Sequence, residues 1–233
     1  MKNTKNILTL ACFIILIPIT VILGATIFSE KGYAFTVFII TILSIIPLFY
    51  AFERKQVSSK ELTIISVMVA LSSIGRFIFA FLPGFKPITA ITIITAIYLG
   101  KEAGFAVGSL SAVISNFYFG QGPWTPFQML SWGLIGLIAG LLSKRLINNK
   151  IALSLFGVFA GIFYSFTMDI WTTLWIDGAF NIARYIASIT TALPITIEYA
   201  ISNIVFLLLL NKPIGNKLKR IKSKFGLFIQ STN

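Results

Sequence analysis

Histidine is absent from this sequence of 233 residues, and cysteine occurs once, as Cys12. Without histidine, the chain lacks the commonest general base and the commonest metal ligand of proteins. A single cysteine can form neither a disulfide within the chain nor a cysteine-based metal site. These absences exclude most enzymes that depend on histidine or on a bound metal.

Recognisable catalytic motifs are also missing. No Gly-rich loop ends in Lys-Ser or Lys-Thr, so the chain cannot itself cradle and hydrolyse ATP. Ser and Asp are present, but no positioned general base would make one of them a nucleophile. We therefore predict a protein that is not an enzyme and has no cofactor. Any active transport would draw its energy from a partner or from an ion gradient.

Charged residues are scarce, at 11%, whereas 57% of the residues are hydrophobic. Soluble domains carry about 25% charged residues, and about 20 apolar residues in a row cross the hydrocarbon core as a helix. The long apolar runs therefore predict an all-α integral membrane protein. Eight transmembrane helices are predicted, at about residues 6–28, 33–52, 62–82, 88–99, 102–119, 126–146, 151–175 and 182–210.

A polar break at residues 53–61 divides the predicted helices into two groups. We predict two N-terminal transmembrane helices in residues 1–56, a six-helix module in 57–213 and a basic tail in 214–233. The first apolar run is too long for the core of a signal peptide and is interpreted as a retained helix. The tail mixes basic and apolar residues, which favours a segment on the membrane surface or a plain basic anchor.

The few charges are unequal in sign, with 19 Lys and Arg against 7 Asp and Glu. Most basic residues fall in alternate loops and in the tail, and such residues mark the cytoplasmic side of a membrane protein. Both termini are therefore predicted to be cytoplasmic. Three loops, 83–87, 120–126 and 172–181, are then predicted to lie outside, where a binding site built from them would open.

Three ionisable residues lie inside predicted helices: Arg76, Asp169 and Glu198. The burial of such groups is costly, which makes each a candidate for a functional role, and all three are predicted to bind the substrate. Glu198 lies near the middle of the last helix and is predicted to face the bundle interior. For Arg76 and Asp169, a structural ion pair or snorkelling to the outer interface is the alternative interpretation.

Aromatic and amide side chains gather near the predicted outer ends of the helices. Trp124, which stands between two prolines in the loop 120–126, is the aromatic residue that we predict to contact a ligand. The predicted substrate-binding set also includes Phe85, Asn116, Tyr118, Gln121, Thr125, Gln128, Trp132 and Trp171. Aromatic walls with a few hydrogen-bonding groups suit a small-molecule site. For the aromatic members, the belt found at membrane interfaces is the alternative.

Small residues recur at a spacing of four, which allows helices to approach closely. Ser66 and Ala70 share one face of a predicted helix and are candidates for docking a partner protein. The same spacing is predicted to serve packing within the bundle in two glycine pairs, Gly104 with Gly108 and Gly136 with Gly140.

Residues 66–87, SVMVALSSIGRFIFAFLPGFKP, and residues 98–142, which include GPWTPFQM, resemble the substrate-binding S component of energy-coupling factor (ECF) vitamin transporters. This resemblance implies a six-helix module with a substrate pocket near the outer face of a bacterial plasma membrane. It also implies a T component docked on the face of Ser66 and Ala70, and two cytoplasmic ATPases. The two additional N-terminal helices depart from the six-helix pattern of the family.

Within that family, the Gly-Pro-Trp-Thr-Pro and Leu-Pro-Gly-Phe segments are most similar to cobalamin-type S components. The resemblance therefore implies a corrinoid substrate, with a smaller vitamin or a queuosine-type precursor as alternatives. From the residues alone, a stand-alone secondary transporter or channel with Glu198 or Asp169 as a proton relay also stays open. A membrane enzyme of lipid metabolism is disfavoured by the missing histidine and metal motifs.

Overall fold

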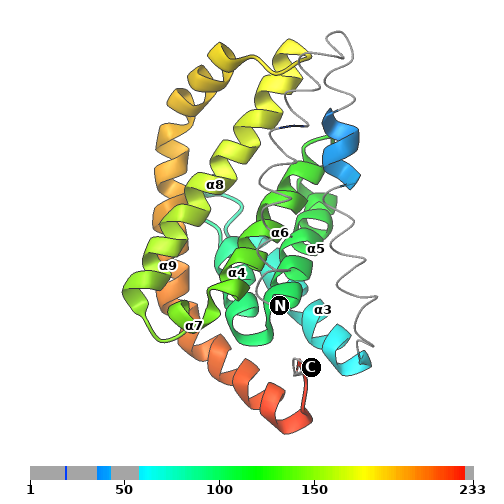
Figure 1. Cartoon of the computed structure of the whole chain (residues 1–233), viewed down its shortest axis with the longest axis vertical. Helices are drawn as coiled ribbons and strands as arrows, with labels where there is room; N and C mark the ends of the chain where they lie inside the picture. Colours follow the sequence, from blue (N-terminus) through cyan, green and yellow to red (C-terminus); the bar gives the residue numbers. More distant parts are fainter. Residues whose placement is uncertain (1–18, 20–35, 43–57, 229–233) are drawn as a thin grey trace.

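A computed structural model describes residues 19, 36–42 and 58–228, and all regular structure in these ranges is helical (Figure 1). The helices are α3 (Ser59–Ile78), α4 (Ile88–Leu99), α5 (Lys101–Phe119), α6 (Thr125–Leu141), α7 (Ser143–Leu146), α8 (Lys150–Asp177) and α9 (Ile182–Phe225). This confirms the all-α prediction for the module. Most of the two predicted N-terminal helices lies outside the described residues, so the count of eight and the side of each terminus stay predictions.

Several helices have the length and composition of membrane spans. In the described ranges, α3, α8 and α9 are apolar enough and long enough to cross a membrane, and α4 and α6 are apolar but shorter. The chain is therefore a multi-pass membrane protein with helices of unequal length. At about 1.5 Å per residue, the 28 residues of α8 extend well beyond the 12 residues of α4.

Local sequence explains where these helices begin and end. Ser58 and Glu61 form a reciprocal capping box at the start of α3. The side chain of Asn149 caps α8, and that of Asn181 caps α9. Gly178 ends α8 in the left-handed conformation, with a φ of 72° that a residue with a side chain adopts at a cost.

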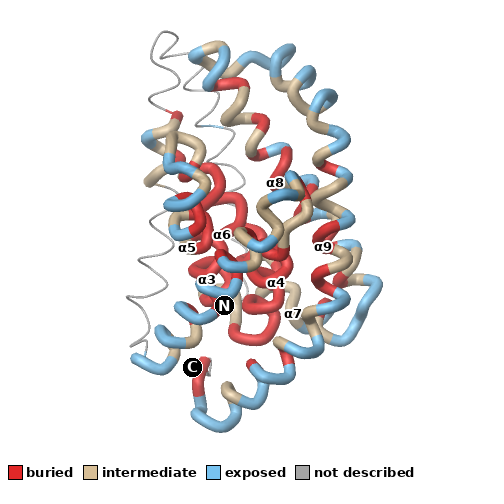
Figure 2. Tube along the Cα trace, turned by 180° about the vertical axis from the view of Figure 1, so that it is seen from behind, coloured by how far each residue is buried: buried red, intermediate tan, exposed pale blue. Residues whose placement is uncertain are grey.

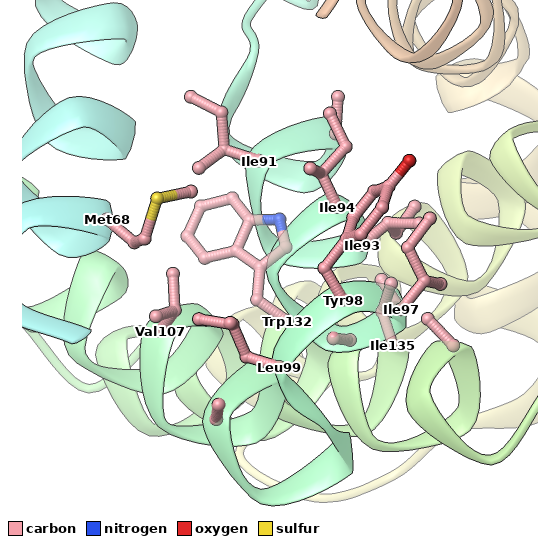
Figure 3. Close-up of a cluster of buried hydrophobic side chains, with 14 of the residues drawn as sticks. Met68, Ile91, Ile93, Ile94, Ile97, Tyr98, Leu99, Val107, Trp132 and Ile135 are labelled. Carbon is pink, nitrogen blue, oxygen red and sulfur yellow. The ribbon is translucent and has the colours of Figure 1, made fainter. Parts of the chain in front are cut away.

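Helix α4 forms the centre of the bundle. All 12 of its residues are buried, and Figure 3 shows its isoleucines packed among Met68, Val107 and Trp132. A helix that is apolar on every side is stable only when other elements surround it. Helix α4 is only about 18 Å long, which is shorter than its neighbours. The connection from α3 therefore enters the bundle before α4 begins.

Helices α5 and α6 pack with their backbones nearly in contact. A Cβ atom added at Gly136 would lie 2.4 Å from the carbonyl oxygen of Gly104, and one added at Gly108 would lie 2.4 Å from that of Trp132. One added at Gly140 would lie 2.3 Å from the Cα atom of Lys101. The prediction that these glycines serve packing within the bundle is confirmed.

Three predicted boundaries are wrong. The first helix of the module ends at Ile78 rather than 82, because residues 79–86 form the turns of the connection that enters the bundle. The helix predicted at 126–146 divides at Leu142, whose ψ of 8° separates α6 from α7. The last helix does not end near residue 210 but continues to Phe225, with Pro194 and Pro213 both inside it.

The final part of the chain, residues 213–228, forms an arm that turns beneath the bundle (Figure 1). Gly215 packs on the ring of Tyr98, and Leu218 is buried. After the helix ends, the backbone N–H of Phe228 donates to Glu61 Oε1 at 2.5 Å. The buried apolar residues of the arm thus pack against the protein. We call this end of the bundle the arm end, and the end at Gly178 the cavity end.

Candidate functional site

A cavity lies between the end of α3, the connection to α4, the first turn of α4 and the middle parts of α6, α8 and α9. The cavity and its mouth hold about 420 Å³ of space. Its lining residues are Arg76, Pro83, Gly84, Lys86, Ile88, Thr89, Trp132, Gly161, Tyr164, Tyr199 and Asn203. Concave sites lined by aromatic side chains and a few convergent polar groups are typical of small-molecule pockets.

Arg76 is the buried cation of this cavity, with only 9% of its surface exposed. Its Nη1 donates to Asn116 Oδ1 at 2.8 Å and to Ser115 Oγ at 2.5 Å. The guanidinium lies over the ring of Phe119 at 4.4 Å and near that of Trp132 at 5.3 Å, in the geometry of a cation–π contact. Among the described residues, the ion pairs are Lys101–Glu102 and Arg184–Asp177, so no carboxylate there pairs with Arg76.

Asn116 connects Arg76 to a chain of polar side chains behind the cavity wall. Its amide donates to Thr125 Oγ1 at 3.0 Å and to Gln128 Oε1 at 2.7 Å. Gln128 in turn donates to the hydroxyl of Tyr164 at 3.2 Å. Since each member fixes the next, the chain sets the orientation of both Arg76 and Tyr164.

An aromatic wall, formed by Trp132, Tyr164 and Tyr199, faces the cavity. The rings of Trp132 and Tyr164 stack with centroids 4.8 Å apart and planes inclined by 14°, and Tyr199 meets Tyr164 edge-on at 5.2 Å. The indole N–H of Trp132 donates to Thr89 Oγ1 at 3.1 Å, which fixes the indole against α4. The wall therefore offers flat apolar surface in a fixed position.

Lys86 brings a second cation to the cavity from the connection between α3 and α4. Its backbone N–H donates to Ser202 Oγ at 2.9 Å, and its Nζ donates to the carbonyl oxygens of Leu82 and Pro83. Burial lowers the pKa of Lys86 from its ordinary value of 10.5, the charge of Arg76 lowers it further, and that of Glu198 raises it. Two positive charges thus border one small cavity.

The structure brings five of the predicted substrate-binding residues together. Arg76 and Trp132 line the cavity, whereas Asn116, Thr125 and Gln128 form the polar chain behind it. All five are buried, as a site inside a bundle requires.

The predicted loop residues lie elsewhere. Trp124 caps the start of α6, and its ring centroid is 6.1 Å from that of Trp171, while neither residue lines the cavity. Gln121 donates to the carbonyl oxygen of Val113 on the exposed side of the loop. Tyr118 is exposed and contacts Phe77 and Phe119. Their roles in binding stay predictions.

The remaining predicted residues are also separate from the lining. Phe85 packs against Phe79 and Phe206. Glu198 is half-buried beside Gly84, close to the cavity mouth. Asp169 is buried on α8, but the structure records no hydrogen bond or ion pair between it and Arg76.

Sequence reasoning did not select several of the lining residues: Lys86, Thr89, Tyr164, Tyr199 and Asn203. Arg76 was selected as an ionisable group within an apolar helix. If the rule is extended to uncharged polar groups, it also selects Asn203, whose amide donates to the carbonyl oxygen of Gly157. Tyr164 and Tyr199 look like ordinary interface or core aromatics until the fold places them together.

The predicted docking face lies on α3. Ser66 and Ala70 are exposed there, and large apolar neighbours such as Val67 and Ile74 are more than half exposed. The described part of the chain leaves this face uncovered. Docking of a partner on it stays a prediction.

A cavity with aromatic walls and a buried cation, enclosed by apolar helices, is typical of a membrane-embedded protein that binds a small molecule. The described residues contain no cluster of three or more metal-ligating side chains. Comparison with protein families identifies the class more closely. The chain belongs to the family of ECF-type riboflavin transporter S components, which matches residues 56–220.

Neither the curated proteins nor the solved structures contain a match to the chain. Family membership confirms the predicted S component, a substrate-specific transporter subunit rather than an enzyme. It also implies a T component and ATPases as partners and a vitamin as the substrate. The cobalamin specificity implied by the sequence resemblance is not confirmed.

Proposed function

We propose that this chain captures riboflavin, or a close flavin relative, in the cavity beside Arg76 and presents it for transport. The observation that carries this proposal is a buried guanidinium without a carboxylate partner in the described ranges, set beside a stacked aromatic wall. The match to riboflavin transporter S components supports the same substrate.

The chemistry of a flavin suits these walls. Its ring system is planar and presents carbonyl oxygens and ring nitrogens as hydrogen-bond acceptors. Arg76 and Lys86 supply donors, and the wall formed by Trp132, Tyr164 and Tyr199 supplies a surface for ring contact. Buried donors that recognise a ligand exclude analogues lacking the matching acceptors, because the donors would then be left unpaired.

Cobalamin is the competing substrate. A corrinoid is a wide macrocycle fringed with amides, whereas a flavin presents one planar ring system. The family match and the stacked wall of Trp132 and Tyr164 support a flavin over a corrinoid. A queuosine-type base, which is also small and flat, is tested alongside both.

In the proposed orientation, the cavity end faces outward across a bacterial plasma membrane. The basic residues of the described chain support this arrangement, since Lys144 and Arg145 lie on α7, Lys150 begins α8, and Lys217 and Lys219 lie on the arm. Substrate then enters at the cavity end. A T component docks on the α3 face of Ser66 and Ala70, and ATPases provide the energy.

Calorimetry on the purified subunit tests the substrate. We expect riboflavin to bind without ATPases or an ion gradient, and we expect cobalamin and a queuosine-type base to show no binding. Cobalamin binding in preference to riboflavin would reverse the assignment. Proton-driven uptake in vesicles lacking any ATPase would instead support the secondary transporter.

The partner surface has its own test. Ala70→Phe places a bulky ring on the proposed docking face, so we expect loss of co-purification with the T component while riboflavin affinity stays unchanged. Ile197→Phe on the exposed side of α9 is the matched control, since Ile197 is also exposed and apolar. Retained co-purification in Ala70→Phe would place the docking surface elsewhere.

A further inference from the structure

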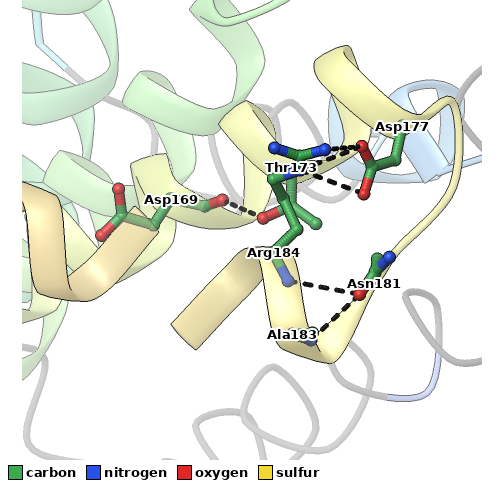
Figure 4. A network of polar contacts seen from close by, with 6 residues as sticks. All are labelled: Asp169, Thr173, Asp177, Asn181, Ala183 and Arg184. Carbon is green, nitrogen blue, oxygen red and sulfur yellow. Dashed lines mark hydrogen bonds and ion pairs between the residues drawn. The ribbon is translucent and has the colours of Figure 1, made fainter. Parts of the chain in front are cut away.

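Asp169 carries a buried carboxylate that its own protein leaves incompletely paired. Only 7% of its surface is exposed, and its Oδ2 has no hydrogen-bond partner among the described residues. Figure 4 shows this carboxylate pointing away from Arg184, which pairs with Asp177 at 3.0 Å. A buried acceptor without a donor is costly, so its retention calls for a physical reason.

The position of Asp169 follows from the packing of α8 on α9. A Cβ atom added at Gly161 would lie 2.8 Å from the backbone nitrogen of Ala200. One turn further along each helix, the hydroxyls of Ser165 and Thr196 form a hydrogen bond of 2.6 Å. One more turn in the same antiparallel register places Asp169 opposite Ala192, which has a short side chain.

From the cavity, this seam continues along α8 toward Gly178, at the cavity end of the bundle. Gly161 lines the cavity, and Asp169 lies two turns beyond it on the same face of α8, about 12 Å along the helix. The hydroxyls of Ser165 and Thr196 lie between them. A polar track thus runs from the aromatic wall to a carboxylate that can accept further hydrogen bonds.

The two ends of this track have opposite chemistry. Arg76 and Lys86 at the cavity donate hydrogen bonds, whereas the carboxylate of Asp169 accepts them. A ligand that fits both ends has acceptors on a ring and donors on a flexible chain. Riboflavin has this arrangement, with a ring that is rich in acceptors and a chain of hydroxyls.

We propose that Asp169 binds the hydroxyl chain of the substrate along the α8–α9 seam, while the ring lies at Arg76 and the aromatic wall. This inference rests on the proposed flavin specificity and adds a subsite to it. Asp169 is then a specificity-determining residue, because it distinguishes a flavin with a polyol chain from the bare ring.

The test compares two ligands on one variant. Asp169→Asn should weaken riboflavin binding roughly ten- to hundred-fold, because a hydrogen bond to a charged group is replaced by one to a neutral group. The affinity for lumiflavin, which has the ring without the hydroxyl chain, should not change. Asp177→Asn is the control, since its carboxylate serves the ion pair with Arg184, and it should change neither affinity.

A second variant keeps the carboxylate and fills the seam. Ala192→Leu should weaken riboflavin binding while sparing lumiflavin, and a thermal unfolding scan of each variant reports whether it folds. Equal losses for both flavins, or unchanged riboflavin affinity in Asp169→Asn, would overturn the subsite while leaving flavin capture intact. If the wild type binds neither flavin, the proposed function itself falls, and this inference falls with it.

Discussion

The middle of α4 and the surroundings of Arg76 satisfy their buried polar groups in different ways. The hydroxyls of Thr92 and Thr95 on α4 donate to carbonyl oxygens of their own helix. By contrast, Arg76, Asn116 and Gln128 depend on partners from other helices. Polar groups satisfied within one helix tolerate small shifts between helices, whereas bonds between helices do not.

Packing also differs between parts of the bundle. Figure 2 shows buried residues concentrated on α4, α5 and α6, while the parts of α8 and α9 near Gly178 carry mostly intermediate and exposed residues. The close contact of α5 with α6 thus forms a rigid support for the site. Trp132 belongs to both regions, because its backbone meets Gly108 and its side chain lines the cavity.

The largest effect of a substitution is expected where α5 and α6 approach each other most closely. Gly108→Ala places a methyl group 2.4 Å from the carbonyl oxygen of Trp132, so α5 and α6 have to separate. We expect a loss of about 3 kcal/mol or more in unfolding free energy, together with weaker ligand binding, because Trp132 moves with its backbone. Thermal unfolding in detergent and calorimetry measure the two effects.

Gly157→Ala is the matched control for this variant. The nearest atom to its added methyl is the end of the flexible Leu207 side chain, at 2.9 Å, which can move aside. It should cost far less stability than Gly108→Ala. Similar losses in both variants would show that the support extends throughout the bundle and is not special to α5 and α6.

The second largest effect is expected from a substitution of Arg76, at the cavity end. Arg76→Gln keeps a polar group near Asn116 and removes the charge, so riboflavin affinity should fall roughly ten- to hundred-fold with only a small change in stability. Arg184→Gln is the control, because its ion pair with Asp177 lies near the surface and contributes little. If both variants lose affinity equally, the cavity uses general positive charge rather than a positioned guanidinium.

The sequence predicted the parts of this architecture that depend on local patterns. Apolar runs predicted the helices. Glycines spaced by four predicted close helix packing, which the structure shows between Gly104 and Gly136. Arg76 could be selected because an ionisable group inside an apolar helix is rare and costly, and Gln128 because it lies among the aromatic residues near the predicted outer ends of the helices. These inferences need only the neighbouring sequence and the membrane as solvent.

What the sequence did not predict depends on contacts between distant segments. Tyr199 reaches the cavity because α9 packs on α8 in one particular register, which no local pattern encodes. The arm could not be foreseen either, since Phe228 meets Glu61 across most of the chain. Its amphipathic pattern suits a lipid surface as well as a protein surface, and only the fold decides between them.

The smallest effect is expected at Trp124, whose loop prompted the prediction of ligand contact. In the structure its ring lies over Gly122 and near Trp171, beyond the residues that line the cavity. Trp124→Ala should therefore weaken riboflavin binding only about two- to five-fold, as expected for the loss of an aromatic pair that supports the site indirectly. Trp175→Ala, an exposed ring that also contacts Trp171, is the control in the same calorimetric titration. A loss as large as that of Arg76→Gln would place Trp124 at the ligand and extend the site to the loop, whereas unchanged affinity would assign Trp124 to the interfacial aromatic belt.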